Sequence, residues 1–165
     1  MNIQLIFIAL FILNMASIWS TVSLKKCEWY RMPGIMIFSI IPLLTVFFEQ
    51  PRFELDFYWW RMAGIIALVL GLGIMIWSRF NFDLQQKMDT AGPYQYVRHP
   101  QYLGLVFMWV GWWWVWAAVY AFYFGMAFLA LTWIEAYLEE KLILEKRFGD
   151  EYREYKHHTG MFWIK

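Results

Sequence analysis

The sequence predicts an all-α integral membrane protein: a bundle of about five transmembrane helices, the last two forming a helical hairpin, followed by a cytoplasmic amphipathic C-terminal tail. Three observations lead to this fold class. Of the 165 residues, 61% are hydrophobic and only 16% are charged, whereas about a quarter of an average soluble chain is charged. The 12 Trp and 15 Phe are more large apolar side chains than a soluble fold of this size can remove from water. Long apolar runs alternate with short polar segments, so we expect a single membrane domain over residues 1–165.

The same composition excludes several other classes of protein. A net charge of only +1 excludes a nucleic-acid-binding arm, and the apolar content excludes disorder. The single cysteine, Cys27, excludes an internal disulfide and a cysteine-based zinc site. His157 and His158 are adjacent, which is a poor spacing for one metal on a helix, so we predict no metal.

The first 80 residues contain three apolar stretches, which we expect to cross the membrane. A spanning helix needs roughly 20 mainly apolar residues. The first stretch, 3–24, has no basic segment before it and no small-residue cleavage site, unlike a signal peptide. The second, 33–48, contains Pro42, which should kink it. In the third, 57–80, Ala63, Ala67 and Gly71 form a stripe nearly bare of side chain, and such a stripe lets another helix approach closely.

The C-terminal half, 81–165, holds a polar loop, a long apolar run and a charged tail. Residues 101–138 are apolar for nearly forty positions, which is too long for one crossing and sufficient for two short ones. We therefore predict a helical hairpin with its bend near residues 114–120. In the tail, Gly149 is expected to end one helix and Asp150 to cap the start of another.

The placement of charge orients the predicted bundle. With five crossings, twelve of the 14 Lys and Arg residues fall on one side and only Arg52 and Arg61 on the other. The positive-inside rule then places the N-terminus outside and the C-terminus in the cytoplasm. The 81–100 loop and the tail should consequently share the cytoplasmic face.

Residues 92–104 contain several chemically functional side chains, and we expect them at one surface of the membrane. Arg98 offers a planar fork of donors suited to a carboxylate or phosphate, and His99 can donate a hydrogen bond or move a proton near neutral pH. Tyr94, Tyr96 and Tyr102 surround them. Each residue alone is compatible with an interfacial loop, but the whole run favours a functional site.

Two further groups lie downstream. Glu135 and Glu139 are one turn apart and share a helix face, next to Glu140, and a carboxylate at membrane depth indicates function by default. Glu139 and Glu140 are equally compatible with the start of a solvated tail. Beyond them, Tyr152 and Tyr155 share a face that can cover a flat ligand or simply dock the tail, with docking favoured for Tyr155.

In this order, the three groups resemble the isoprenylcysteine carboxyl methyltransferase family and its phospholipid methyltransferase relatives. The resemblance covers residues 92–155 through the motif G-x-Y-x-x-x-R-H-P-x-Y-x-G, the Glu139-Glu140 pair, and F-G-x-x-Y-x-x-Y at 148–155. It implies a membrane enzyme that binds S-adenosylmethionine between its C-terminal elements and takes a lipophilic acceptor from the bilayer. By this analogy His99, Tyr102 and Gly104 contact the cofactor, and Glu140 is the downstream acidic position.

The chemistry of S-adenosylmethionine fits the residues of these groups. Arg98 or His99 can take its carboxylate, and Glu139 or Glu140 can accept its ribose hydroxyls. Tyr96, Tyr102 or Tyr152 can stack on adenine or face the sulfonium by cation–π attraction. We assign catalytic roles to Arg98, Glu135 and Glu140.

One position departs from the pattern of the carboxyl-methylating members. They often carry an Arg five residues before the position of Glu140, where this chain has Glu135. A glutamate repels a carboxylate acceptor but can hold or deprotonate an amine. A lipid amine or a thiol is therefore at least as well suited as a prenylcysteine carboxylate.

Two other functions fit the sequence less well. A membrane reductase of the sterol reductase type has a similar C-terminal region and binds a nicotinamide dinucleotide, but it normally has a longer chain. A non-catalytic membrane scaffold would bind neither cofactor.

Overall fold

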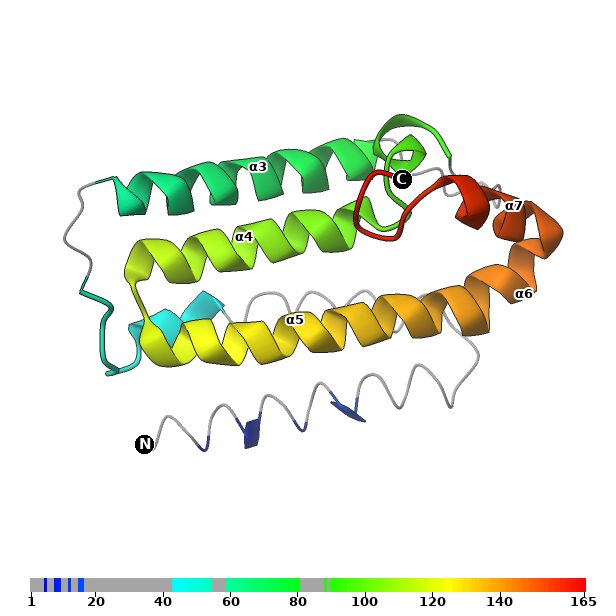
Figure 1. Cartoon of the computed structure of the whole chain (residues 1–165). Helices are drawn as coiled ribbons and strands as arrows, with labels where there is room; N and C mark the ends of the chain where they lie inside the picture. Colours follow the sequence, from blue (N-terminus) through cyan, green and yellow to red (C-terminus); the bar gives the residue numbers. More distant parts are fainter. Residues whose placement is uncertain are drawn as a thin grey trace.

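The computed structural model describes residues 43–54, 59–80, 88 and 90–165, together with six single residues of the N-terminal part: Leu5, Ile8, Ala9, Ile12, Met15 and Ala16. Most of the predicted helix 3–24 and most of the predicted helix 33–48 lie outside the described residues. The part of the chain that is described is helical and contains no strand (Figure 1).

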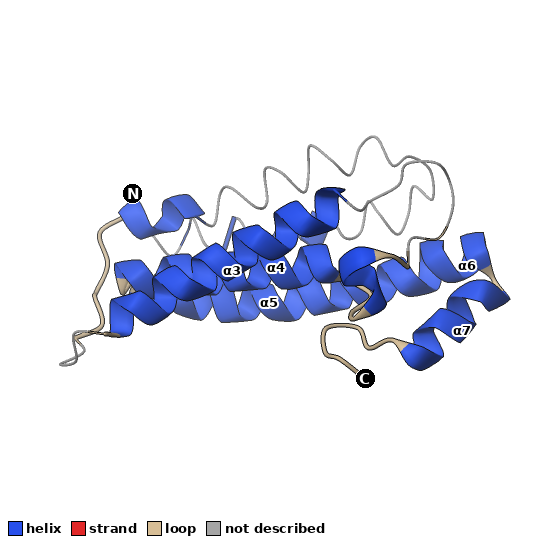
Figure 2. Ribbon diagram, turned by 90° about the horizontal axis from the view of Figure 1, so that it is seen from above, coloured by secondary structure: helices blue, strands red, loops and turns tan. Residues whose placement is uncertain are grey.

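Three long helices run side by side and form the body of this part (Figures 1 and 2). They are α3 (Trp60–Phe80), α4 (Pro100–Trp116) and α5 (Val119–Glu139). Helix α5 continues through a π-helical segment, η3 (Glu140–Leu144), into α6 (Glu145–Phe148), and α7 (Asp150–His158) then turns back beside that end. Two short 3-10 helices, η1 (Thr45–Phe47) and η2 (Gly92–Gln95), lie in the connecting segments.

The predicted hairpin is confirmed, since α4 and α5 are separated only by Ala117 and Ala118. Gly149 ends α6 with a φ of 58°, as predicted, but it also precedes α7 directly. Asp150 is therefore the first residue of α7 and not its cap, because the positive φ of Gly149 redirects the chain one residue earlier than expected.

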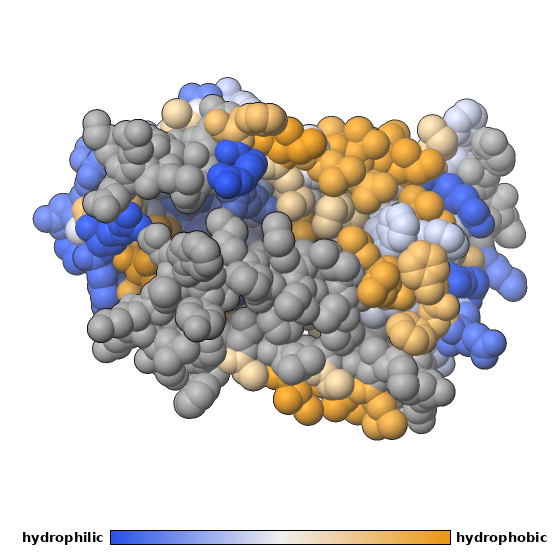
Figure 3. All heavy atoms as spheres, turned by 180° about the vertical axis from the view of Figure 1, so that it is seen from behind, coloured by the Kyte–Doolittle hydropathy of each residue, from blue (hydrophilic) through white to orange (hydrophobic). Residues whose placement is uncertain are grey.

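Within the described part of the chain, two helices are long and apolar enough to cross a membrane: α3, and the continuous helix from Val119 to Phe148. On the face shown in Figure 3, hydrophobic residues gather between hydrophilic ones at both ends of the molecule. On α3, apolar side chains such as Ile66, Val69 and Phe80 are exposed in the described structure, as expected of a helix in lipid. Five crossings and their orientation remain predictions.

Helices α3 and α4 touch backbone to backbone through four glycines. Gly71 faces Gly104 and Gly64 faces Gly111, and an added Cβ at Gly71 or at Gly111 would lie only 2.5 Å from a backbone oxygen of the other helix. The predicted stripe was only partly right. Gly71 lies in the contact, but Ala63 is exposed, and the buried line on α3 is Gly64, Gly71 and Ser78. The true repeat is seven residues, which keeps one face toward the partner for two turns.

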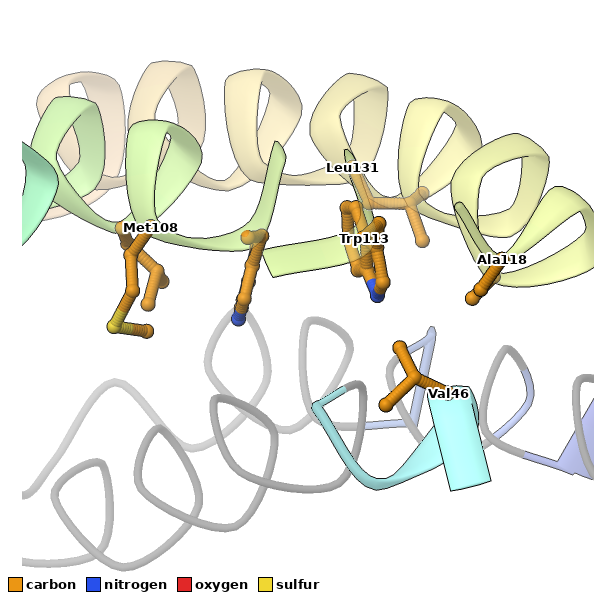
Figure 4. Close-up of a cluster of buried hydrophobic side chains, with 8 residues drawn as sticks. Val46, Met108, Trp113, Ala118 and Leu131 are labelled. Atoms are coloured by element: carbon orange, nitrogen blue, oxygen red, sulfur yellow. The ribbon is translucent and has the colours of Figure 1, made fainter. Parts of the chain in front are cut away.

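The apolar core lies between α4 and α5. Met108, Trp113 and Leu131 belong to it, with Ala118 from the turn and Val46 from η1 (Figure 4). The ring of Trp113 lies against Gly125, where a Cβ would be 1.9 Å from a ring carbon. This packing fixes α5 relative to α4 and so fixes the position of the carboxylates at the end of α5.

The segment 50–54 closes one end of this bundle. Arg52 donates to the carbonyl oxygens of Trp116 at 2.8 Å and Val46 at 3.0 Å. Ala117, the residue that ends α4, has a φ of 51°, a left-handed conformation that favours glycine. Arg52 therefore lies at the end of the bundle opposite residues 91–99 and the C-terminal tail (Figure 1).

Candidate active site

Four segments meet at the other end of the bundle: the loop before α4, the end of α5, helix α7 and the residues after it (Figure 1). The tail is held by backbone bonds, since the Arg98 N–H donates to the oxygen of Gly160 at 2.8 Å and the His99 N–H to that of Met161 at 3.2 Å. The Tyr155 hydroxyl donates to the carbonyl of Tyr94. Docking of the tail by Tyr155 is thus confirmed.

The carboxylate of Glu140 is the centre of this site. Its Oε1 accepts from Nε of Arg98 at 2.7 Å and from Nε2 of His99 at 3.1 Å. Its Oε2 accepts from Nη2 of Arg98 at 3.3 Å and lies 3.1 Å from Nζ of Lys156. Glu140 is fully buried, and the side chains of Arg98 and His99 are only 8% and 6% exposed. Charges so far from water persist only when they are paired and hydrogen-bonded.

Lys156 extends this cluster to a second carboxylate. Its Nζ lies 3.0 Å from Oε1 of Glu145, besides its contact with Glu140. Burial lowers the pKa of the Lys156 ammonium, but the hydrogen bonds and charges of Glu145 and Glu140 outweigh burial and leave the pKa raised. Lys156 is therefore charged at neutral pH and ties α7 to η3 and α6.

Glu139 has different surroundings from its neighbour. Its Oε2 accepts from the Tyr102 hydroxyl at 3.0 Å, and the side chains of both residues are half-buried. The Tyr102 ring also lies beside the His99 ring, with 5.6 Å between centroids. The two adjacent glutamates thus contact different residues of the loop and of α4.

Tyr152 places a polar atom in the interior of the site. The residue is 2% exposed, and its hydroxyl has no hydrogen-bond partner among the described residues. Burial, and then the negative charge of Glu140, raise the pKa of this phenol. A buried hydroxyl is normally satisfied by the protein or by something bound to it.

The structure brings six of the nine predicted site residues to this end of the bundle: Arg98, His99, Tyr102, Glu139, Glu140 and Tyr152. The other three have different surroundings. Tyr96 is 47% exposed and its ring is 6.3 Å from that of Trp77 on α3. Gly104 packs against Gly71 and Met75, which explains its missing side chain. Glu135 is half-buried, five residues before Glu140 on α5.

Several functional features were not predicted from the sequence. In the sequence, Lys156 is one of several charged residues in the tail and nothing marks it, and the carbonyl oxygens of Lys156 and Thr159 both accept from Nη1 of Arg98. The π-helical segment that begins at Glu140 was also missed; such segments often occur at functional sites. The residues themselves carry no signal for this segment, because its departure from α-helical geometry depends on tertiary contacts.

The cluster can orient an imidazole and a guanidinium beside carboxylates, next to aromatic rings. Among the described residues, no group of three or more His, Cys, Asp or Glu side chains is placed so that it could hold a metal ion. The donors, carboxylates and rings suit a polar organic ligand.

The described part of the chain is all-helical, with two helices long and apolar enough to cross a membrane, and it holds a buried polar cluster at one end of the bundle. This combination is typical of a helical membrane protein with a polar site at the end of its bundle. The family model of phospholipid methyltransferases matches residues 59–151, more than half of the 165-residue chain. The chain belongs to this family of membrane methyltransferases. A search of the curated proteins found no match.

The matched region begins just before α3 and ends within the first turn of α7. It includes Arg98, His99 and Glu140, but not Lys156 or Thr159. The membership in a phospholipid methyltransferase family confirms the resemblance inferred from the motifs.

Proposed function

We propose that this protein transfers a methyl group from S-adenosylmethionine to a lipophilic acceptor that is dissolved in the membrane. Family membership supports methyl transfer. The observation that carries the proposal is the meeting of Arg98 and His99 with Glu139 and Glu140, about forty residues apart in the sequence, at one end of the bundle.

The residues present fit the parts of this cofactor. S-adenosylmethionine supplies a methyl group activated by a positively charged sulfur. Arg98 or His99 provides donors for its carboxylate, and the neighbouring glutamates provide acceptors for ribose hydroxyls. Tyr102 offers a ring face for adenine or the sulfonium, and the unpartnered hydroxyl of Tyr152 offers one more polar contact.

The protein's contribution to the reaction is alignment and exclusion of water. Methyl transfer is a direct displacement, so the acceptor atom, the methyl carbon and the sulfur must lie in line. Fixing such a geometry can lower a barrier by about 7–11 kcal/mol. The burial of Arg98, His99 and Glu140 keeps water from the groups that hold the cofactor.

The acceptor class follows from Glu135. This carboxylate lies one turn deeper in α5 than Glu139, toward the apolar part of the helix. An amine that receives a methyl group as an ammonium must lose a proton, and a carboxylate can hold the ammonium or take that proton. A lipid amine, or a neutral thiol, is therefore preferred over an acceptor that carries a carboxylate.

The test is incubation of the purified protein with methyl-labelled S-adenosylmethionine and a membrane lipid extract, followed by identification of the labelled product. Defined lipid amines, thiols and prenylcysteine analogues then rank the acceptors. We expect a labelled lipid, its loss in His99→Ala, and wild-type labelling in the exposed control Glu154→Gln. Absence of labelling together with binding of a nicotinamide dinucleotide would favour a reductase instead. Turnover of only the prenylcysteine analogue would reverse the acceptor preference.

A further inference from the structure

The carboxylate of Glu140 has no acceptor site left for a ligand. An ionised carboxylate offers about four lone-pair directions. Two of these directions belong to Oε1, which accepts from Nε of Arg98 and from Nε2 of His99. The other two belong to Oε2, which accepts from Nη2 of Arg98 and pairs with Nζ of Lys156. A ribose diol could bind this carboxylate only by displacing buried cations, which is costly because an unpaired buried charge is left behind.

Four of the five N–H donors of Arg98 are already used, and the bonds that do not go to Glu140 hold the tail. While Nε and Nη2 face Glu140, Nη1 donates to the carbonyl oxygens of Lys156 and Thr159. The bonds from the backbone of Arg98 and His99 to Gly160 and Met161 continue this attachment. Glu140 therefore fixes the guanidinium, and the guanidinium fixes the chain from the end of α7 onward.

The same carboxylate selects the reactive nitrogen of His99. Because the carboxylate can only accept, Nε2 of His99 donates to it, and Nδ1 is the nitrogen left to accept a hydrogen bond or a proton. The ring is held between those of Tyr102 and Phe162, at 5.6 and 6.0 Å between centroids. Glu140 thus sets the orientation of a residue that can contact a ligand.

We propose that the adjacent glutamates have separate roles: Glu140 is a positioning residue that acts through Arg98, His99 and Lys156, and Glu139, with Tyr102, is the acidic residue that contacts the cofactor. The half-buried side chains of Glu139 and Tyr102 are accessible, whereas Glu140 is not exposed at all. This inference rests on the proposed function and refines it, because it assigns the ribose hydroxyls to Glu139.

The matched pair Glu140→Gln and Glu139→Gln tests this division of roles in the purified full chain. Both variants keep the shape of the side chain and remove one charge. Three readouts are needed: trypsin cleavage after Arg153 without any ligand, nitrogen NMR of labelled histidine, and calorimetric affinity for S-adenosylmethionine.

We expect Glu140→Gln to speed cleavage of the tail at least tenfold and to change the tautomer signal of His99. Glu139→Gln should leave both readouts as in the wild type and weaken cofactor binding at least tenfold. If Glu140→Gln does not fold, Lys156→Gln provides the second measurement, because it removes one contact to Glu140 and should speed cleavage after Arg153 to a smaller extent.

The opposite outcome overturns the proposal. A Glu140→Gln protein with a protected tail and an unchanged histidine signal, but with lost cofactor affinity, would make Glu140 a direct ligand. Unchanged affinity in Glu139→Gln would remove its assigned role. If the wild type binds no S-adenosylmethionine, the proposed function fails, while the cleavage and histidine readouts still decide whether Glu140 positions Arg98 and His99.

Discussion

A single added methyl group at Gly71 should separate two helices that now touch. In Gly71→Ala the new Cβ would lie 2.5 Å from the carbonyl oxygen of Gly104 and from the backbone nitrogen of Met108. Ordinary contacts of a Cβ begin near 3.4 Å, so α3 and α4 must move apart by about 1 Å at this point. Because the opposing atoms are backbone, no side chain can rotate away to relieve the overlap.

The size of the effect follows from the packing that is lost. A gap of about 0.5–1 Å already forfeits a quarter to a half of each dispersion contact along the helix pair. Overpacking of this kind typically costs about 1–3 kcal/mol, and the higher helix propensity of alanine returns up to about 1 kcal/mol. For a chain of this size, each kcal/mol shifts the unfolding midpoint by about 2–4 °C, so we expect a net fall of several degrees.

Gly73, two residues after Gly71 on α3, provides a matched control. An added Cβ at Gly73 meets nothing within 4 Å in the described structure, so Gly73→Ala should be neutral or slightly stabilising. Both variants can be followed by tryptophan fluorescence during thermal unfolding of the detergent-solubilised protein. Equal midpoints for Gly71→Ala and Gly73→Ala would refute the backbone-to-backbone contact.

Three further outcomes follow from other parts of the structure. Gly125→Ala should lower the unfolding midpoint because its Cβ would overlap the Trp113 ring, and adding Trp113→Leu should recover part of the loss; no recovery would locate the damage elsewhere. Ala117→Gly should raise the stability by about 1 kcal/mol, since the residue at φ 51° no longer pays for a left-handed backbone, and a lower midpoint would contradict this. Because the raised pKa of Lys156 lies above its unfolded value, its contribution is complete below the ordinary lysine range and is lost only as pH rises through the folded pKa. Protection of Arg153 against a protease active over a broad pH range should therefore be constant between about pH 6 and 9, and a loss within that window would exclude the Lys156 ion pair as the cause.

The elements that follow from length and polarity were predictable. The hairpin between α4 and α5 follows from nearly forty apolar residues, because one helix of that length exceeds the thickness of a bilayer. The bend could be placed only within residues 114–120, since the carbonyl oxygen of Ala117 accepts from the N–H of Phe53 at 2.8 Å, a residue that is distant in the sequence.

The helix contact was predicted with the wrong register. In the sequence, small residues recur every four positions at Ala63, Ala67 and Gly71. In the structure, Gly64 and Gly71 are the residues of α3 that contact α4. Which of two overlapping small-residue stripes is buried depends on where the partner has its own small residues, Gly104 and Gly111. Such information belongs to the pair of helices and not to either one.

The core of the candidate site was predictable and its outer part was not. Arg98, His99 and Glu140 stand out because charged residues beside apolar runs are costly without a partner. Lys156 and Thr159 could not be recognised, because one lies in a tail rich in charges and the other contributes only a backbone oxygen. The departure from α-helical geometry at Glu140 depends on tertiary contacts and leaves no pattern in the residues themselves.

The attachment of the final residues to the loop before α4 has a practical consequence for handling this protein. Phe162 packs on His99, and Lys165 donates to the carbonyl of His157, so a purification tag or fluorescent fusion joined directly after Lys165 would start three residues from Phe162, the residue that lies against the imidazole. Preparations that carry such an extension would be poor guides to native turnover, and a cleavable tag at the other terminus is the better choice for assays.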